Sequence, residues 1–227
     1  EDKFTKVFTV AIQLGAILSV VVLYFKKFVD FKNGQFYLKL IIAVIPALLL
    51  GKLFSEKIDE LLEKPIFIAC VMLAGGIFFL FADNLFRDPE IKDEKEVNYL
   101  TALRIGLFQC LAILLPGLSR SAATIIGGMS LKLTRNAAAE FSFFLAVPTM
   151  FAATVYKLYK YYSDNGGFST NEIKQLAIGN IVAFVVALIA IKFFIGFLKK
   201  HGFKVWGWYR IIVGCILLLL IYIGYIK

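Results

Sequence analysis

The chain has 227 residues, a formal net charge of +9 and 60% hydrophobic residues. Its mean hydropathy of +0.80 exceeds what a soluble domain of this size can bury, which excludes an ordinary soluble protein. The basic residues lie at the ends of apolar segments and in short loops. Membrane topology explains them better than a nucleic-acid partner does, and no nucleic acid is expected.

Long apolar segments, rather than short alternating strands, predict an all-α polytopic membrane protein. A helix that crosses the hydrocarbon core of about 30 Å needs about 20 residues. Residues 1–227 are therefore expected to form a single integral membrane domain. The segments that come close to the required length are residues 8–25, 36–53, 66–82, 136–162, 173–198 and 206–225.

The first span carries a glutamine, Gln13, in apolar surroundings. A glutamine inside a membrane helix either hydrogen-bonds a neighbouring helix or reaches into a functional site, and the sequence leaves both open. Between the second and third spans, apolar residues recur at helical spacing among charges over residues 54–64. This pattern predicts a short amphipathic helix along the membrane interface. Gly75-Gly76 in the third span predicts a close approach of another helix.

The stretch from Asp83 to Glu96 is the one strongly polar part of the chain. Acidic and basic residues mix there without the spacing of metal ligands. We interpret it as a solvated loop rather than a metal site.

Residues 99–115 and 121–133 flank the run from Leu115 to Thr124. The second flank is too short to span comfortably, at about 13 residues. We therefore predict a re-entrant helical hairpin over residues 98–133, with its tip at Pro116-Gly117. Irregular backbone at membrane depth is tolerated only where it is buried in protein or lines a cavity.

The chemistry of this run suits an oxyanion, and phosphate best. Pro116-Gly117 stops one helix, so the residues after Ser119 can begin another with free N–H groups, as at anion-binding helix N-termini. Arg120 adds a planar fork of donors, and an intramembrane arginine marks a functional site by default. The hydroxyl donors are Ser119, Ser121 and Thr124. The alternative is a tight turn whose hydroxyls bond back to helix carbonyls while the arginine snorkels to the surface.

Glu140 follows the motif closely in sequence and can pair with Arg120 or Arg135. A structural ion pair is favoured over direct catalysis, because Glu140 stands at the start of a span, near the interface.

These residues carry a resemblance to a known family. The chain closely resembles the bacterial undecaprenyl-diphosphate phosphatases of the bacitracin-resistance type, over essentially its whole length. The proline-glycine-x-serine-arginine-serine motif is the most specific part of the resemblance. The matching segments are residues 109–112, 116–124, 139–143 and 146–148, with 12–17, 45–47 and 183–191.

The resemblance implies an inverted-repeat architecture in which each half contributes a re-entrant hairpin. The hairpin of residues 98–133 resembles the second one. The family's first hairpin carries a glutamate-rich helix and a proline-valine-serine-serine-threonine-glycine-histidine run. This sequence contains no such run, so we expect the family's first hairpin to be missing from this chain.

The implied reaction is hydrolysis of undecaprenyl diphosphate to undecaprenyl phosphate and inorganic phosphate, in the bacterial inner membrane, by a multi-pass enzyme. Arg120 and Ser119 would be catalytic, and Glu140 would support them. No base accompanies Ser119 or Ser121, so the nucleophile and the acid are expected from the absent hairpin. The expected substrate-binding residues are Ser121, Thr124, Gly117, Gln109 and Gln13.

The resemblance also implies a divalent cation, Mg²⁺ or Ca²⁺, bridging diphosphate oxygens, with acidic ligands outside this chain. We assign no metal ligand within residues 1–227. The expected partners are the polyprenyl lipid and the bilayer, and a homodimer is left open. The alternative function is an inverted-repeat transporter or flippase for a phosphorylated lipid or an ion, in which Arg120 is a counter-ion.

Overall fold

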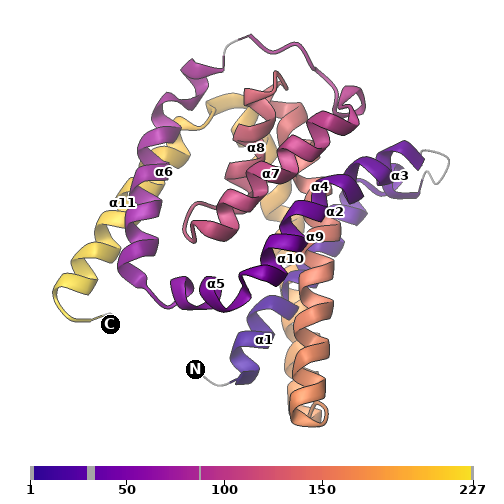
Figure 1. The fold of residues 1–227 in the computed structure, drawn as a ribbon, viewed down its shortest axis with the longest axis vertical. Coiled ribbons are helices and arrows are strands. Elements are labelled where there is room, and N and C mark those ends of the chain that lie inside the picture. The colour runs from indigo at the N-terminus through magenta and orange to yellow at the C-terminus, as the bar shows by residue number, and fades with distance from the viewer. Residues whose placement is uncertain (1–2, 30–33, 87, 226–227) are drawn as a thin grey trace. The chain divides into compact units, whose positions relative to one another are not determined.

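The computed structural model describes residues 3–29, 34–86 and 88–225, which are almost entirely helical (Figure 1). Among these residues the extended structure is limited to an isolated bridge between Ile91 and Leu133. The helices are α1 (Lys3–Ala11), α2 (Gln13–Leu23), α3 (Phe25–Val29), α4 (Gly34–Leu53), α5 (Ser55–Leu62), α6 (Pro65–Leu85), the 3₁₀ turn η1 (Glu94–Glu96), α7 (Tyr99–Leu114), α8 (Arg120–Ser130), α9 (Arg135–Asn165), α10 (Thr170–His201) and α11 (Lys204–Tyr222).

In the described part of the chain, six helical segments are long and apolar enough to cross a membrane. This confirms the prediction of a polytopic all-α protein with about six spans, and each predicted span coincides with one segment. Many large apolar side chains point outward, as expected where lipid replaces water. The segments are Lys3–Leu23, Gly34–Leu53, Pro65–Leu85, Arg135–Asn165, Thr170–Leu198 and Lys204–Tyr222.

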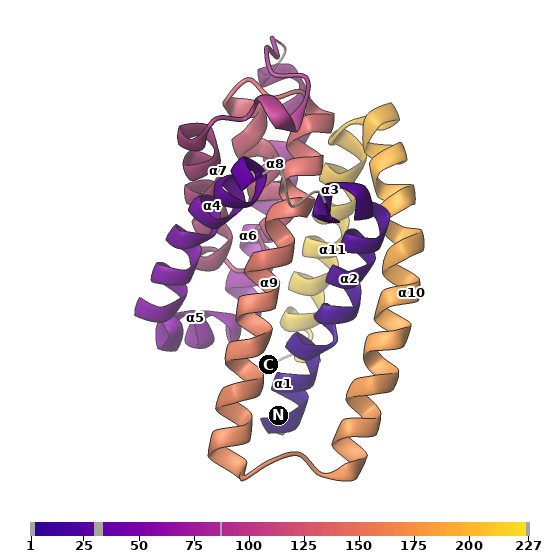
Figure 2. The same ribbon diagram turned by 90° about the vertical axis from the view of Figure 1, so that its right-hand side faces the viewer.

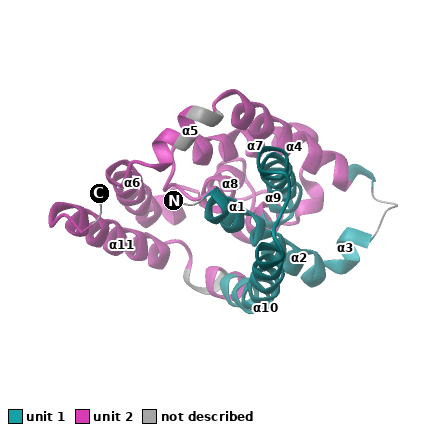
Figure 3. Ribbon diagram, turned by 90° about the horizontal axis from the view of Figure 1, so that it is seen from below, with its two compact units in different colours: residues 1–35, 143–194 teal, residues 36–142, 195–227 magenta. Residues whose placement is uncertain are grey.

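The described residues form two compact units, coloured in Figure 3. Unit 1 comprises residues 1–35 and 143–194, and unit 2 comprises residues 36–142 and 195–227. The helices α9 and α10 each contribute to both units. The motif and both of its flanking helices belong to unit 2.

In unit 1 the first span, Lys3–Leu23, is divided at Ile12 into α1 and α2. Side chains of other helices bind backbone groups on either side of this break. The Thr154 hydroxyl donates to the Val10 carbonyl at 3.2 Å, and the Gly15 N–H donates to Asn180 Oδ1 at 2.8 Å. Figure 2 shows α1 and α2 beside α9 and α10.

In unit 2, α6 and α11 lie side by side (Figure 1). Their backbones approach closely because both helices present glycine at the contact. A Cβ on Gly76 would lie 2.9 Å from the Gly207 carbonyl oxygen and 2.9 Å from Ile211. The close approach predicted from Gly75-Gly76 is confirmed.

The polar stretch after α6 differs from the prediction in two ways. α6 continues to Leu85, so Asp83 is helical rather than part of a loop. Its carboxylate accepts from Arg135 Nη2 at 2.5 Å and from the Phe203 N–H at 2.7 Å, which joins the start of α9 and the start of α11 to the end of α6. Glu94 is buried, whereas most of its charged neighbours are exposed as a solvated loop requires.

The short helix predicted after the second span is present as α5. Ile58 and Leu61 are half-buried, whereas Lys57 and Glu60 are exposed. Lys64 Nζ lies 2.5 Å from Glu60 Oε1, and this hydrogen bond holds the pKa of the Glu60 carboxyl below its ordinary value. The position of α5 along the membrane interface stays a prediction.

Candidate active site

The motif forms a tight connection between two short helices. α7 ends at Leu114, and α8 begins at Arg120 and has 11 residues. Neither helix reaches the length of about 20 residues that a span requires. This is the geometry of the predicted hairpin, whereas its re-entrance into the membrane stays a prediction.

The turn is built from residues that cannot continue a helix. Pro116 lacks an N–H, and Gly117 has φ +100, a region that favours glycine. The Leu118 N–H donates to the Leu115 carbonyl at 3.0 Å and closes the turn. A Cβ on Gly117 would lie 2.6 Å from the Ile68 carbonyl oxygen of α6, so the turn also needs glycine for its close contact.

Ser119 is the most strained residue of the turn. Its φ of 74 and ψ of 119 lie in a region that L-residues rarely adopt, which costs about 1–3 kcal/mol. Ser119 is exposed, and its side chain makes no capping hydrogen bond to α8. An exposed hydroxyl held by strained backbone at a helix start is typical of a functional site.

The N-terminus of α8 is open. The Ala123 N–H is the first to bond within the helix, to the Ser119 carbonyl at 3.0 Å. The N–H groups of Arg120, Ser121 and Ala122 precede it and have no intrahelical acceptor. Together with the helix dipole they form an arrangement that binds oxyanions.

Arg120 occupies the first position of α8 and is half-buried, with its Nη1 atom fully enclosed. A guanidinium in this position combines a fixed positive charge with donors in a plane, which matches phosphate oxygens. Ser121, the next residue, is also half-buried.

Thr124 lies inside the protein instead of at the surface of the turn. Its hydroxyl donates within α8 to the carbonyl of Arg120 at 3.0 Å or of Ser121 at 3.1 Å, and it lies 2.6 Å from the Ser142 hydroxyl of α9. For Thr124 the geometry follows the alternative in which hydroxyls bond back to helix carbonyls. This residue ties the first turn of α8 to α9.

The remaining predicted residues are spread over three helices. Gln109 is almost fully buried in α7. Glu140, on α9, lies 3.5 Å from the Asn136 amide, and the ion pair of Arg135 is with Asp83. Gln13 begins α2 and is half-buried in unit 1. The roles assigned to these residues stay predictions.

Sequence reasoning missed Arg210, in the apolar helix α11. Its side chain is 8% exposed, and its Nη2 atom donates to the Gly117 carbonyl at the tip of the turn. The guanidinium also lies over the Phe79 ring, 5.3 Å from the centroid. The signal was available, because an arginine inside an apolar span is a candidate functional residue by default.

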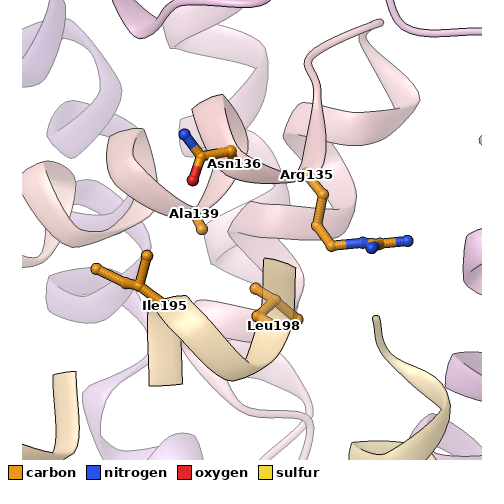
Figure 4. A pocket seen from close by; sticks show the side chains of 5 residues that line it. All are labelled: Arg135, Asn136, Ala139, Ile195 and Leu198. Carbon is orange, nitrogen blue, oxygen red and sulfur yellow. The ribbon is translucent and has the colours of Figure 1, made fainter. Parts of the chain in front are cut away.

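A small hollow lies elsewhere in unit 2, between the start of α9 and the end of α10 (Figure 4). It is too shallow to enclose a water molecule, and none of the motif side chains line it. Its lining is Arg135, Asn136, Ala139, Ile195 and Leu198.

No three histidine, cysteine or acidic side chains gather as metal ligands among the residues that the structure describes. The donors around the motif are hydroxyls, amides and guanidinium groups, which suit an anion and not a cation. The described residues therefore do not fit a divalent cation by themselves.

Among the described residues, six helical segments of membrane-crossing length and a short helical hairpin define a polytopic α-helical membrane protein, whose hairpin turn carries Ser119, Arg120 and Ser121. A family model described as "Bacitracin resistance protein BacA" matches residues 1–216. The chain belongs to this family.

Relatives of this chain carry the name undecaprenyl-diphosphatase. The protein from Flavobacterium psychrophilum is 59% identical over 219 residues, which cover 96% of this chain and 82% of the relative. The protein from Porphyromonas gingivalis is 52% identical, and the match covers 97% of this chain and 84% of the relative. The protein from Bdellovibrio bacteriovorus is 43% identical, and the match covers 99% of this chain and 84% of the relative. The family resemblance seen in the sequence is confirmed.

Proposed function

We infer that this protein hydrolyses undecaprenyl diphosphate to undecaprenyl phosphate and inorganic phosphate, within the membrane that holds the lipid. The observation that carries the proposal is the uncapped start of α8, where Arg120 and the strained Ser119 stand together. Membership of a family whose relatives are named undecaprenyl-diphosphatase supplies the substrate. These names favour hydrolysis over the transporter alternative.

The site would act mainly by positioning and electrostatics. Hydrolysis breaks the bond between the terminal phosphorus and the bridging oxygen, while water supplies the new oxygen on phosphorus. Charge on the phosphoryl oxygens is stabilised in the transition state by donors fixed in advance. Arg120 and the N–H groups of Arg120, Ser121 and Ala122 provide such donors, and the Ser119 hydroxyl adds one at the rim.

The lipid tail and the diphosphate make opposite demands on the protein. A polyprenyl chain needs an apolar environment, which the outward-facing apolar side chains of the six spans share with the bilayer. The diphosphate needs polar donors, and the motif turn supplies them. Ser121 is proposed as a further phosphate ligand, and Gly117 is proposed to serve substrate binding by forming the tight turn that presents Ser119 and Arg120.

The decisive experiment measures release of inorganic phosphate from undecaprenyl diphosphate in detergent, using the product of the complete gene. Arg120→Ala should lower kcat by about 1000-fold or more, because it removes the guanidinium that neutralises charge in the transition state. Arg104→Ala is the matched control, since Arg104 lies exposed on the neighbouring α7. Its activity should equal that of the wild type.

Two outcomes would contradict the proposal. An equal loss of phosphate release in Arg120→Ala and Arg104→Ala would show that only the net charge of the protein matters and that Arg120 has no specific role in the site. Movement of the lipid diphosphate across vesicles without phosphate release would replace hydrolysis by transport.

A further inference from the structure

Arg210 is a buried cation inside an apolar span. It lies in the middle part of α11, a helix that meets the length and hydropathy of a membrane crossing. An arginine at such a place is costly, so it is expected to face a polar partner within the protein. The partner that the structure gives it is a backbone carbonyl, that of Gly117.

No ion pair explains this arginine within the described ranges 3–29, 34–86 and 88–225. The salt bridges found there join other residues, and the buried Nε atom of Arg210 has no hydrogen-bond acceptor among them. Its aromatic neighbour Phe79 contributes a cation–π contact and no negative charge. The hydrogen bond of Arg210 is therefore directed at the motif turn.

The surrounding helices make room for this contact. Gly75 of α6 lies beside the guanidinium, so a Cβ there would be 3.0 Å from Arg210 Nη2 and 3.5 Å from the Leu118 side chain. Glycine at position 75 leaves the space that the guanidinium needs to reach the turn.

The bond fixes one particular peptide unit. The Gly117 carbonyl accepts from Arg210, and the Leu118 N–H at the other end of the same peptide donates to Leu115 at 3.0 Å. A peptide held at both ends cannot rotate without breaking a hydrogen bond. The next residue is Ser119, whose strained backbone sets the direction of the first N–H groups of α8.

We propose that Arg210 is a positioning residue for the phosphate site, acting through the Gly117 carbonyl. It holds the turn so that Ser119 and the α8 amides face the substrate, and its charge raises the positive potential around the turn. This role depends on the proposed phosphatase activity. It requires no contact between Arg210 and the substrate.

The test compares phosphate release per folded molecule in four variants of the complete protein. Arg210→Met keeps the bulk of the side chain and removes the donor and the charge, and Arg210→Lys restores the charge with a single nitrogen. Gly75→Ala puts a methyl group against the guanidinium. Gly214→Ala is its matched control, because the added methyl would lie nearest to Leu73, at 2.8 Å, in the same pair of helices.

Arg210→Met should lower kcat by about 100-fold at nearly unchanged KM, as for a misplacement of about 1 Å in a catalytic group. Arg210→Lys should recover part of the loss, and Gly75→Ala should lower kcat while Gly214→Ala does not. Arg210→Met should also add little to the defect of Arg120→Ala, since both act on one site.

Wild-type kcat per folded molecule in Arg210→Met would overturn the positioning role. Equal losses of kcat in Gly75→Ala and Gly214→Ala would also overturn it, because disturbed packing between α6 and α11 would then explain both losses. If Arg210→Met does not fold, the two glycine variants decide alone. Absence of phosphate release from the wild type would instead refute the proposed function.

Discussion

Both ends of α8 carry a non-glycine residue with positive φ, but the two ends differ in their hydrogen bonds. Each end has a non-glycine residue with positive φ, Ser119 at 74 before the helix and Lys132 at 71 after it. Lys132 lies in a hydrogen-bonded junction, where its carbonyl accepts from the Glu90 and Ile91 N–H groups at 2.8 and 2.9 Å. Ser119 stands at an end whose first N–H groups have no intrahelical acceptor.

The residues after Lys132 are also held by hydrogen bonds within the protein. The Leu133 N–H donates to Gly128, and the Thr134 N–H donates to Ile91 at 2.8 Å. The Thr134 hydroxyl then caps α9 by accepting from the Ala137 N–H at 3.2 Å. Strain at this end is offset by hydrogen bonds within the protein.

The comparison indicates where a ligand completes the structure. At the end of α8 hydrogen bonds from Glu90 and Ile91 hold the backbone of Lys132, whereas at the start of α8 the first N–H groups precede the first intrahelical bond. A strained residue at such a helix start is expected where function requires it. We therefore interpret the start of α8 as the reactive end and the end of α8 as its anchor.

The largest effect is expected at Gly117. Gly117→Ala forces a side chain into φ +100 and against the Ile68 carbonyl, which should destabilise the protein by about 1–3 kcal/mol. The displaced turn should lower kcat by about 1000-fold, because several donors move together. Thermal unfolding in detergent and phosphate release measure the two effects. If folded Gly117→Ala has the kcat of the wild type, the conformation of the turn does not matter for catalysis and the interpretation is wrong.

Two substitutions at Ser119 distinguish the effect of the strained backbone from that of the hydroxyl. Ser119→Ala keeps the strained backbone and removes the hydroxyl, whereas Ser119→Gly also relieves the strain. Both should lower kcat by about 100-fold, the cost of one transition-state donor. Their stabilities should differ, with Ser119→Gly more stable than Ser119→Ala by about 1 kcal/mol. The interpretation fails if Ser119→Ala is fully active.

The buried hydroxyl pair Thr124 and Ser142 is expected to affect stability more than activity. Thr124→Val leaves the Ser142 hydroxyl without its buried partner and should cost about 1–3 kcal/mol. Adding Ser142→Ala should cost less than the sum of the single changes, by about 0.5 kcal/mol or more. Denaturant or thermal unfolding of the two single variants and the double variant measures this coupling. Strict additivity would mean that the two hydroxyls do not interact.

Local sequence was sufficient for the spans and for the motif turn. Runs of about 20 apolar residues leave few alternatives to membrane helices, and Pro116-Gly117 ends a helix by its own chemistry. The break at Ile12 was not predictable, because no proline or glycine stands at that residue, and the side chains that bind the backbone beside it, Thr154 and Asn180, lie far away in the sequence. The contact of Arg210 with Gly117 joins residues 93 positions apart, so only packing reveals it.

The smallest effect is expected at the anchored end of α8. Lys132→Gly relieves the positive φ but adds freedom to the unfolded chain, so stability should change by less than about 1 kcal/mol. The lost pair with Glu90 matters little, because at 3.7 Å both side chains are largely exposed. Phosphate release should equal that of the wild type, in contrast to the loss in Ser119→Gly. Equal activity losses in the two glycine variants would mean that both ends of α8 serve the same purpose, and the distinction between a reactive end and an anchor would fall.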